Sequence, residues 1–388
     1  MKKQLYFILL LLSCFQITAQ QLSPKATISV ITCGPGNELY STFGHSAFRV
    51  YDATLGIDKI YNYGTFNFNA PNFYLNFAKG QLTYQLSTSS FGRFLRIYNY
   101  ENRWVKAQEL DLTITDVQTI YNFLENNAKP ENKSYQYDFF YDNCSTKIEQ
   151  VLKAVLKDHV QFNNSHITTI KTHRDLIADY TVNHKWSKFG IDLALGSVID
   201  KEATKDNYKF LPDYIYKAFN NATLNSNKAL VRNERVILTE KKLVIENSKL
   251  LQPISFFLVL LFFILLITYK NKKSNKRSKW LDFLLYFTTG IIGIVVLLLW
   301  FATSHTATYR NLNFLWAFAP NLIVAFFLLK SKLPKWLVIY NWFLLILVVL
   351  IVLFWVLKVQ IFNNALIPFI VTLSVRYLFL INYQKSRL

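Results

Sequence analysis

The sequence predicts an α+β exported domain followed by a helical membrane domain, and three observations lead to this prediction. Residues 1–20 combine basic and apolar residues in the layout of a secretory signal peptide. Residues 21–250 have ordinary polar content and alternate strand-like with helix-like segments, which is enough chain to bury a core. Residues 251–388 are almost continuously apolar and bring the hydrophobic content of the whole chain to 52%.

The N-terminal segment indicates export. Lys2 and Lys3 precede an apolar run at 5–12, and the small residue Ala19 offers an ordinary cleavage site. The alternative is that LLSC at 11–14 is a lipobox, in which case Cys14 would be a lipidated first residue. Both interpretations place the mature protein outside the cytoplasm.

The apolar third of the chain predicts five membrane-spanning helices and their orientation. Segments of about 20 apolar residues are long enough to cross a bilayer. The link 270–279 holds five lysines and one arginine and the link 330–335 holds three lysines, whereas the two other links hold one basic residue each. Basic loops stay inside, so we expect a multi-pass bacterial inner-membrane protein with a periplasmic domain and a cytoplasmic C-terminus. The expected spans are 253–269, 281–302, 313–329, 336–357 and 364–382.

The net charge of +19 does not require a nucleic-acid partner. Much of it is the lysine of the inner loops, and the rest could favour anionic lipid headgroups. No basic stripe with interleaved aromatic residues stands out, so we expect no nucleic-acid binding. The histidines at 159, 166, 173 and 184 have no zinc-motif spacing, and we expect neither a metal site nor a cofactor.

Local patterns predict the elements of the exported domain. Two helices are expected at 115–127 and 143–157, where apolar residues recur at helical spacing. The segment 70–79 resembles a short aromatic-rich helix or loop, and 228–250 is expected to be a linker helix or stalk entering the membrane. Segments rich in β-branched and aromatic residues predict strands at 27–33, 46–52, 58–63, 81–87 and 104–112.

Cys144 and His45 are the candidate catalytic residues. Cys144 directly follows Asp142 and Asn143, which are good capping residues, so its sulfur is expected above the N-terminus of a helix. The helix dipole and unpaired amides there lower a thiol pKa and can stabilise an oxyanion. His45, at the start of an expected strand, could then act as general base and acid or as the imidazolium partner of a thiolate.

Two non-catalytic interpretations of Cys144 remain open at this point. Export favours oxidation, and Cys33 lies twelve residues before His45, so Cys33 and Cys144 could form a disulfide. Such a protein would be a non-enzymatic, membrane-anchored sensor domain. Alternatively, Cys144 could simply be buried.

Three motifs together resemble the signatures of the Lnb family, bacterial lipoprotein N-acyltransferases. They are TCGPGNELY at 32–40, FGHSAFRV at 43–50 and YDFFYDNCST at 137–146. Shorter matches cover most of the mature chain and lie at 63–66, 186–196, 210–213, 304–306 and 311–316. The resemblance implies a permuted, NlpC-type papain-like exported domain, in which the histidine precedes the cysteine.

The resemblance also implies a reaction. An acyl chain would pass from a phospholipid to a cysteine thioester and then to the N-terminal amine of a diacylglyceryl-cysteine lipoprotein. Phospholipid, diacylated lipoprotein and membrane are thus the expected partners. The enzyme alternative is a cysteine amidase or peptidase acting on cell-wall peptides, which the same thiol and imidazole could support.

Three residues could orient the histidine. Pairing of the strand at 46–52 with the next strand would bring Asn62 or Tyr63 near His45, and Glu38 is the acidic alternative on the preceding loop. Asn143 is an accessory candidate through its position beside Cys144. None of these is preferred on sequence alone.

Three further charged or titratable residues have two interpretations each. Arg49 could face a phosphate or simply be an exposed strand residue. His305 lies in an outer loop, where it could meet the active site or sit among headgroups. Arg376 lies within the last expected span, which suggests a partner or a headgroup contact, although snorkelling to the inner surface explains it equally well.

Overall fold

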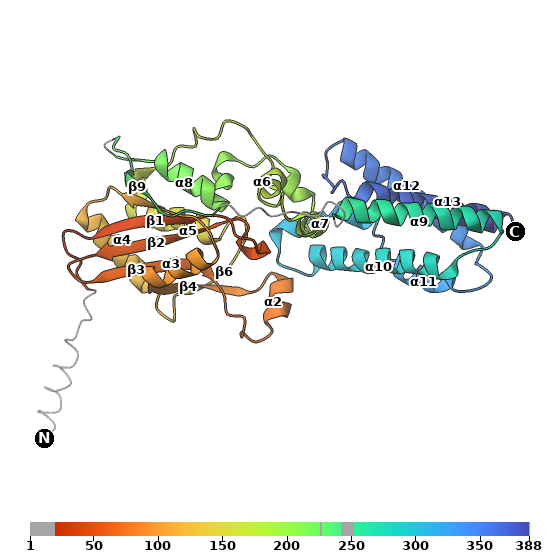
Figure 1. The fold of residues 1–388 in the computed structure, drawn as a ribbon, viewed down its shortest axis with the longest axis horizontal. Coiled ribbons are helices and arrows are strands. Elements are labelled where there is room, and N and C mark those ends of the chain that lie inside the picture. The colour runs from red at the N-terminus through yellow and green to blue at the C-terminus, as the bar shows by residue number, and fades with distance from the viewer. Residues whose placement is uncertain (1–19, 226, 242–251, 388) are drawn as a thin grey trace, which may run out of the picture.

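The computed structural model describes residues 20–225, 227–241 and 252–387. The expected signal peptide and Cys14 lie outside the described residues. The chain forms a mixed α/β domain that stands at one end of a bundle of long helices (Figure 1).

The exported domain is built on a seven-stranded sheet with the order β6-β4-β3-β2-β1-β5-β9, in which every neighbouring pair is antiparallel. The five strands predicted from the sequence are all present. The strands are β1 Thr27–Cys33, β2 His45–Asp52, β3 Ile57–Thr65, β4 Thr83–Ser90, β5 Val105–Leu110, β6 Ser134–Gln136 and β9 Val231–Leu238, and a separate pair joins β7 Val160–Gln161 to β8 Thr223–Leu224.

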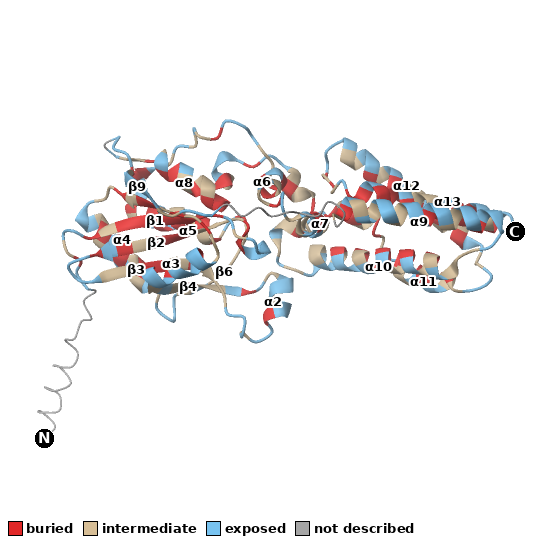
Figure 2. Ribbon diagram, viewed as in Figure 1, coloured by how far each residue is buried: buried red, intermediate tan, exposed pale blue. Residues whose placement is uncertain are grey.

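Helices cover both faces of the sheet. On one face, α4 (Ile114–Asn127) and α5 (Cys144–Leu156) bury their apolar sides against the central strands. On the other face, α3 (Phe91–Tyr100) packs with Phe91, Phe94 and Tyr98 facing the strands. Figure 2 shows the buried residues gathered on the sheet and on the inner sides of these helices. The two predicted helices, α4 and α5, are thus confirmed. Their buried apolar residues recur at helical spacing and form one face that packs on the sheet.

The expected linker helix at 228–250 is wrong where the structure describes it. Val231–Leu238 forms strand β9, which pairs with β5 at the edge of the sheet. The segment combines polar residues at 232–235 with the β-branched residues Val231, Val236 and Ile237, and it pairs with backbone groups that the edge of β5 would otherwise leave exposed. Residues 242–251 lie outside the described part of the chain.

A smaller layer of helices lies between the sheet and the bundle. It packs around Phe140, Tyr208 and Phe210 as a second apolar cluster. The helices of this layer are α6 His173–Tyr180 and α7 Lys185–Ala194. Helix α8 Pro212–Asn220 packs instead on the sheet core beside α5, and α2 Phe73–Lys79 has no residue in this cluster. Short 3-10 turns lie at Leu39–Ser41, Lys157–His159, Ser197–Asp200 and Lys205–Phe210.

Four helices of the described C-terminal part are long and apolar enough to cross a membrane. They are α9 Pro253–Lys273, α10 Lys279–Phe301, α12 Trp336–Val356 and α13 Leu366–Lys385. The expected third span, 313–329, is instead a 3-10 turn, Leu312–Leu315, followed by the eight-residue helix α11, Asn321–Leu328. Pro320 lacks an amide proton and restricts the residue before it, so a continuous helix cannot run through this segment.

This broken segment packs directly on α10. A side chain at Gly293 would place its Cβ 2.0 Å from the Ala317 carbonyl oxygen, and one at Gly290 would come within 2.2 Å of the Leu322 nitrogen. Only glycine allows two backbones to approach this closely. The chain therefore returns along α10 without forming a full-length helix.

The basic connections meet at the end of the bundle away from the sheet, as Figure 1 shows. Arg277 donates to the Leu328 and Lys330 carbonyls at 2.7 and 2.9 Å. Nearby, Arg376 has a protein partner: its Nε lies 3.0 Å from Asp282 Oδ1, and both side chains are fully buried. The pairing with Asp282 offsets the cost of burying the charge and explains how Arg376 is accommodated within an apolar helix.

Candidate active site

The N-terminus of α5 is held by its capping residue. Asn143 Oδ1 accepts hydrogen bonds from the amides of Ser145 and Thr146 at 2.8 and 3.0 Å, and Thr146 Oγ1 accepts from the Asn143 amide at 2.8 Å. This reciprocal arrangement is a capping box. Asn143 Nδ2 also donates to the carbonyls of Phe139 and Phe210, at 2.7 and 2.8 Å. Asn143 is buried and therefore fixes Cys144, the first residue of α5.

The cap changes the expected chemistry of this helix end. Two of the first-turn amides, those of Ser145 and Thr146, are already bound by Asn143. They are not free to hold a thiolate or an oxyanion. The Cys144 sulfur accepts instead from the Ser46 backbone amide and from the Ser145 side chain. The helix dipole still contributes a positive potential at this end.

Asn62 contacts the imidazole. His45 is the first residue of β2, and Asn62 lies on the neighbouring strand β3. The His45 Nε2 donates to Asn62 Oδ1. With Nε2 engaged as a donor, Nδ1 is the ring nitrogen that remains for the thiol.

Cys144 and His45 interact and shift each other's pKa. Burial disfavours the thiolate, but the charge of His45 and the hydrogen bonds from His45 and Ser46 outweigh burial and lower the pKa of Cys144. Burial also disfavours the imidazolium, but the thiolate, with hydrogen bonds to Cys144 and Asn62, raises the pKa of His45. The two directions both favour the charged forms, thiolate and imidazolium, over the neutral pair.

A glycine makes room for the thiol. Gly64 has φ of +83°, and a Cβ there would lie 3.3 Å from Cys144 Cβ. The pairing of β3 with β4 shifts register between Asn62 and Thr65, so the chain bends at this point. Sequence reasoning included Gly64 only within the short match at 63–66 and did not place it in the site, because no local pattern signals the approach of α5.

Tyr137 is a second residue that sequence reasoning missed. Burial, with a further contribution from the Cys144 charge, raises the pKa of Tyr137 well above its usual value. Its ring stacks on Tyr84 with centroids 4.1 Å apart. The signal that could have identified it is its place at the start of the 137–146 motif.

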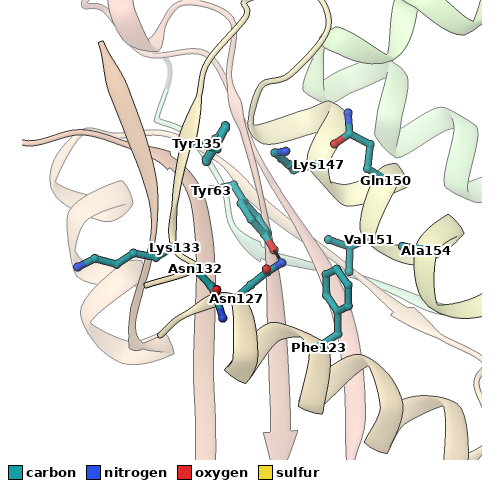
Figure 3. Close-up of a pocket in the computed structure, with 10 residues that line it drawn as sticks. All are labelled: Tyr63, Phe123, Asn127, Asn132, Lys133, Tyr135, Lys147, Gln150, Val151 and Ala154. Carbon is teal, nitrogen blue, oxygen red and sulfur yellow. Dashed lines mark hydrogen bonds between the residues drawn. The ribbon is translucent and has the colours of Figure 1, made fainter. Parts of the chain in front are cut away.

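Tyr63 points away from the imidazole. Successive strand residues face opposite sides of a sheet, so Tyr63 and Asn62 cannot both reach His45. The Tyr63 hydroxyl accepts from Asn127 Nδ2 at 2.9 Å, and burial raises the pKa of Tyr63 to about 12. Its ring lines a cavity of about 200 Å³ beside α4 and α5, shown in Figure 3. The structure thus separates Tyr63 from the thiol.

Glu38 and Arg49 are also not brought to the thiol. Glu38 is exposed on the loop before a 3-10 turn, where its carbonyl accepts from Ser41. Arg49 forms a two-point ion pair with Asp58, at 2.7 and 3.0 Å, and lies 3.8 Å over the Phe91 ring. The role of Arg49 in the structure is thus a cross-strand contact.

Cys33 and Cys144 are both free thiols in the structure. Cys33 lies opposite His45 in the pairing of β1 with β2, so it is near the site. It is buried in the apolar cluster under α3, and burial raises the pKa of its thiol far above the usual value. A thiol in this environment is inert, and the expected alternative of a Cys33–Cys144 disulfide is not what the structure contains.

His305 contacts α2 on the exported domain. Its Nε2 lies 3.1 Å from the Phe77 carbonyl oxygen, and the Ser304 amide donates to the Lys79 carbonyl at 2.8 Å. Thr306 Oγ1 donates to Asp138 Oδ2 at 2.8 Å. This outer loop therefore joins the exported domain to α10.

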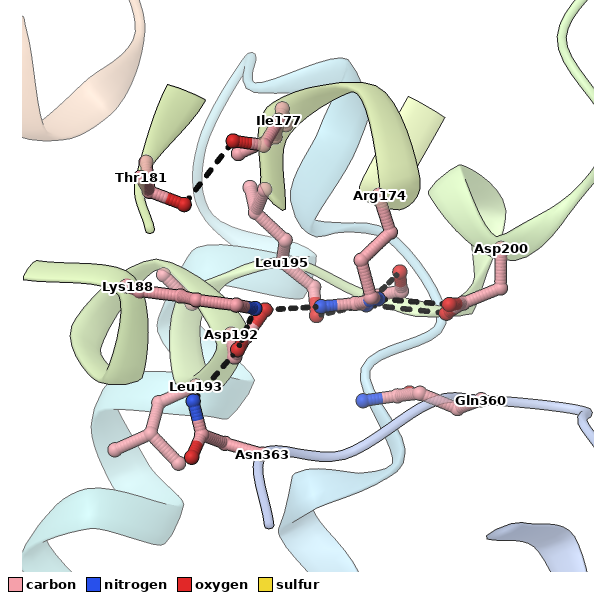
Figure 4. A network of polar contacts seen from close by, with 12 residues as sticks. Arg174, Ile177, Thr181, Lys188, Asp192, Leu193, Leu195, Asp200, Gln360 and Asn363 are labelled. Atoms are coloured by element: carbon pink, nitrogen blue, oxygen red, sulfur yellow. Dashed lines mark hydrogen bonds and ion pairs between the residues drawn. The ribbon is translucent and has the colours of Figure 1, made fainter. Parts of the chain in front are cut away.

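A buried polar network forms the second junction between domain and bundle (Figure 4). Arg174 on α6 pairs with Asp192 at 3.1 Å and with Asp200 at 2.7 Å, and all three side chains are at most 4% exposed. Asn363, from the loop before α13, donates to Asp192 Oδ2 at 2.8 Å. The outer residues Asn311 and Asn313 donate to backbone carbonyls of α7 at 2.7 to 3.3 Å. These contacts hold α7 against the bundle.

Comparisons with known proteins agree in both parts of the chain. A family model described as the Lnb N-terminal periplasmic domain matches residues 16–178. A second, described as the Lnb transmembrane domain, matches residues 245–387. Comparison with curated proteins and with solved structures gives no significant match. The two models are the two domains of one family and together span most of the sequence. The chain therefore belongs to the Lnb family, as an inner-membrane protein with a periplasmic domain.

Proposed function

We propose that this protein is a lipoprotein N-acyltransferase that uses phospholipid as acyl donor and Cys144 as nucleophile. The observation that supports the proposal most strongly is the interaction of Cys144 with His45, which lowers the pKa of the thiol and raises that of the imidazole. These two residues belong to a domain joined to the end of a bundle of helices long enough to cross a membrane, where lipid-anchored substrates would be within reach. Membership of the Lnb family fits this activity.

The reaction would proceed in two transfers. In the first, the Cys144 thiolate attacks the carbonyl carbon of a phospholipid ester, the ester C–O bond breaks, and His45 gives its proton to the departing lysophospholipid oxygen. In the second, the lipoprotein amine attacks the thioester. His45 then takes the proton from the amine, and the Cys144 thiolate leaves. Asn62 would hold the imidazole throughout.

The same proposal covers the expected architecture. The order of His45 on a strand and Cys144 on a later helix fits a permuted papain-like domain, carried by residues 21–250 after a signal peptide at 1–20. The segment that includes α11 would make the third of five membrane crossings within 251–388. The end that carries Arg277 and Lys330 would face the cytoplasm, and so would the C-terminus.

The test is to trap the acyl-enzyme. The purified full-length protein is incubated with phospholipid vesicles without acceptor, and the modified peptide is located by mass spectrometry. We expect one acyl group, sensitive to hydroxylamine, on Cys144, and its transfer to an added diacylated lipoprotein peptide. An acyl group on another residue would contradict the mechanism. Cleavage of cell-wall peptide without lipid acylation would instead support the amidase alternative.

Asn62→Ala is expected to reduce the reactivity of Cys144 without removing it. The Asn62 hydrogen bond raises the pKa of His45, so its loss lowers that pKa and leaves less ion pair at neutral pH. Alkylation of Cys144 by iodoacetamide should therefore fall about tenfold at neutral pH, since a hydrogen bond to a charged group is worth about 1.5 kcal/mol. The remaining thiolate should appear at higher pH.

The matched control is Asn127→Ala, which removes a comparable amide that contacts Tyr63 and not His45. Its alkylation profile should follow that of the wild-type protein. Identical profiles for Asn62→Ala and wild type would show that Asn62 does not set the protonation of His45.

A further inference from the structure

The segment 66–80, which we call the aromatic flap, exposes more large apolar side chains than a soluble surface normally carries. Within it Tyr74 is 80% exposed, Phe68 64%, Phe77 55% and Leu75 51%. The flap contains no acidic residue and a single lysine. A contiguous exposed apolar patch of this kind marks a contact with a partner or a membrane.

The flap lies at the level where α10 leaves the membrane. The Lys79 carbonyl, at the end of α2, accepts from the amide of Ser304, three residues after the end of α10 at Phe301. The 23 residues of α10 are about 34 Å long, whereas the hydrocarbon layer is about 30 Å thick and the interfaces bring the total to about 40–45 Å. The flap is thus placed in the interfacial layer.

The surface of the flap continues the lipid-facing surface of the bundle. Phe301, in the last turn of α10, is 72% exposed, and a Cβ added at Gly80 would lie 3.0 Å from His305, so the loop after α10 packs closely on the flap. In Figure 1, α2 stands on the side of the exported domain that faces the bundle, near the end of α10. Aromatic side chains are enriched at this depth because their rings prefer the interface.

A run of ring contacts connects the flap with the thiol. Phe73 contacts Phe66 with centroids 5.7 Å apart, Phe66 contacts Tyr84 at 5.3 Å, and Tyr84 stacks on Tyr137 at 4.1 Å. Tyr137 begins the 137–146 segment that leads into Cys144 at the start of α5, and the Cys144 charge adds to the burial that raises the pKa of Tyr137. The series therefore consists of two phenylalanine and two tyrosine rings, each in contact with the next.

We propose that the aromatic flap inserts into the outer leaflet beside α10 and that lipid acyl chains reach Cys144 along the rings of Phe73, Phe66, Tyr84 and Tyr137. The flap then acts as an interfacial element that partly withdraws a lipid ester from the bilayer. The membrane contact is inferred from the exposed apolar side chains of the flap and from its position beside α10. The route to Cys144 rests in addition on the proposed function. The two parts therefore have separate tests.

The first test measures depth. A nitroxide is attached to Tyr74→Cys in the full-length protein, with the other cysteines replaced by alanine so that no activity is required. In phosphatidylethanolamine and phosphatidylglycerol nanodiscs, the label should collide with oxygen and be shielded from a water-soluble nickel complex. The control is Leu55→Cys, 40% exposed on the turn between β2 and β3, at the other end of the strands from His45.

The control label should collide with nickel and little with oxygen. The same behaviour at position 74 would overturn the membrane contact. Shielding of position 74 from both reagents would also overturn it, because the flap would then be covered by protein.

The second test measures the route. In the double variant Tyr74→Ser, Leu75→Ser, thioester formation on Cys144 from vesicle phospholipid should fall by roughly tenfold or more, because two inserted apolar side chains are lost. Its reaction with a short water-soluble ester should be unchanged, and Leu55→Ser should change neither rate. Equal losses with both donors would overturn the route. A wild-type protein that forms no thioester from any phospholipid would overturn the route together with the proposed function, whereas the depth result would still stand.

Discussion

Replacing Cys144 with serine is expected to abolish thioester formation and lower N-acylation by roughly 10⁴-fold or more, the scale of losing a catalytic nucleophile. His45 and Ser46 lower the pKa of Cys144, which favours the thiolate that the proposed mechanism uses. A serine hydroxyl in the same place keeps its proton and has no comparable nucleophile to offer. The measurement is the transfer of acyl chain to a diacylated peptide, followed by mass spectrometry.

The matched control is Cys33→Ala, which removes the other described thiol. Cys33 is 1% exposed and lies among apolar side chains, and burial raises its pKa. We expect activity within a few-fold of wild type. Equal inactivation of the two variants would instead point to a disulfide between them and would contradict the nucleophile assignment.

Arg174→Met is expected to cause a large loss of stability, about 3–5 kcal/mol, because it leaves the buried Asp200 carboxylate without its ion-pair partner. Asp200 is 2% exposed and relies on Arg174, whereas Asp192 keeps Lys188 at 2.7 Å. The melting midpoint of the full-length protein in nanodiscs should fall by roughly ten degrees.

The loss should depend on pH, with a sign that follows from Asp200. Burial already raises the pKa of Asp200, and Arg174 opposes that rise. Without Arg174 the folded pKa increases further above the unfolded value, so the folded state becomes less stable as pH rises through that interval. The variant should therefore recover part of its stability in acid. A loss that is constant with pH would contradict this account.

The control for Arg174 is Lys171→Met. Lys171 pairs with Asp179 at 2.6 Å, but the two side chains are 33% and 46% exposed. An exposed ion pair contributes about 0–1 kcal/mol, so this variant should melt close to wild type. A fall as large as that of Arg174→Met would show that burial is not the cause.

The local residue pattern was enough to predict the helices and strands that depend mainly on the sequence of the segment itself. The strand at Thr27–Cys33 and the helix that begins at Cys144 follow from alternation, helical spacing and a good cap. In contrast, Val231–Leu238 forms a strand because β5 offers a free edge, and that edge is more than a hundred residues away in sequence. The charged residues of this segment are equally compatible with an exposed helix, so the local sequence did not exclude one.

The same distinction holds at the site. Strand pairing was enough to suggest that Asn62 lies near His45. Successive strand residues face opposite sides of the sheet, so Tyr63 points away from the imidazole. The approach of Gly64 to Cys144 depends on how α5 meets the sheet, which no local pattern encodes. The Arg174 network likewise joins α6, α7 and a membrane loop that are distant in sequence.

Under the proposed function, the junction at α7 has a consequence for which lipids would serve as acyl donors. Asn313 and Asn363, from two separate loops of the bundle, both donate hydrogen bonds to Asp192 of α7. The loop at Ser304 binds the exported domain at a third point. The height of Cys144 above the bilayer plane is then set by the protein and not by the substrate. A fixed height favours attack on an ester bond at one depth in the bilayer, and it does not discriminate between acyl chains of different length below that bond. Phospholipids that differ only in acyl-chain length should therefore serve as donors at similar rates.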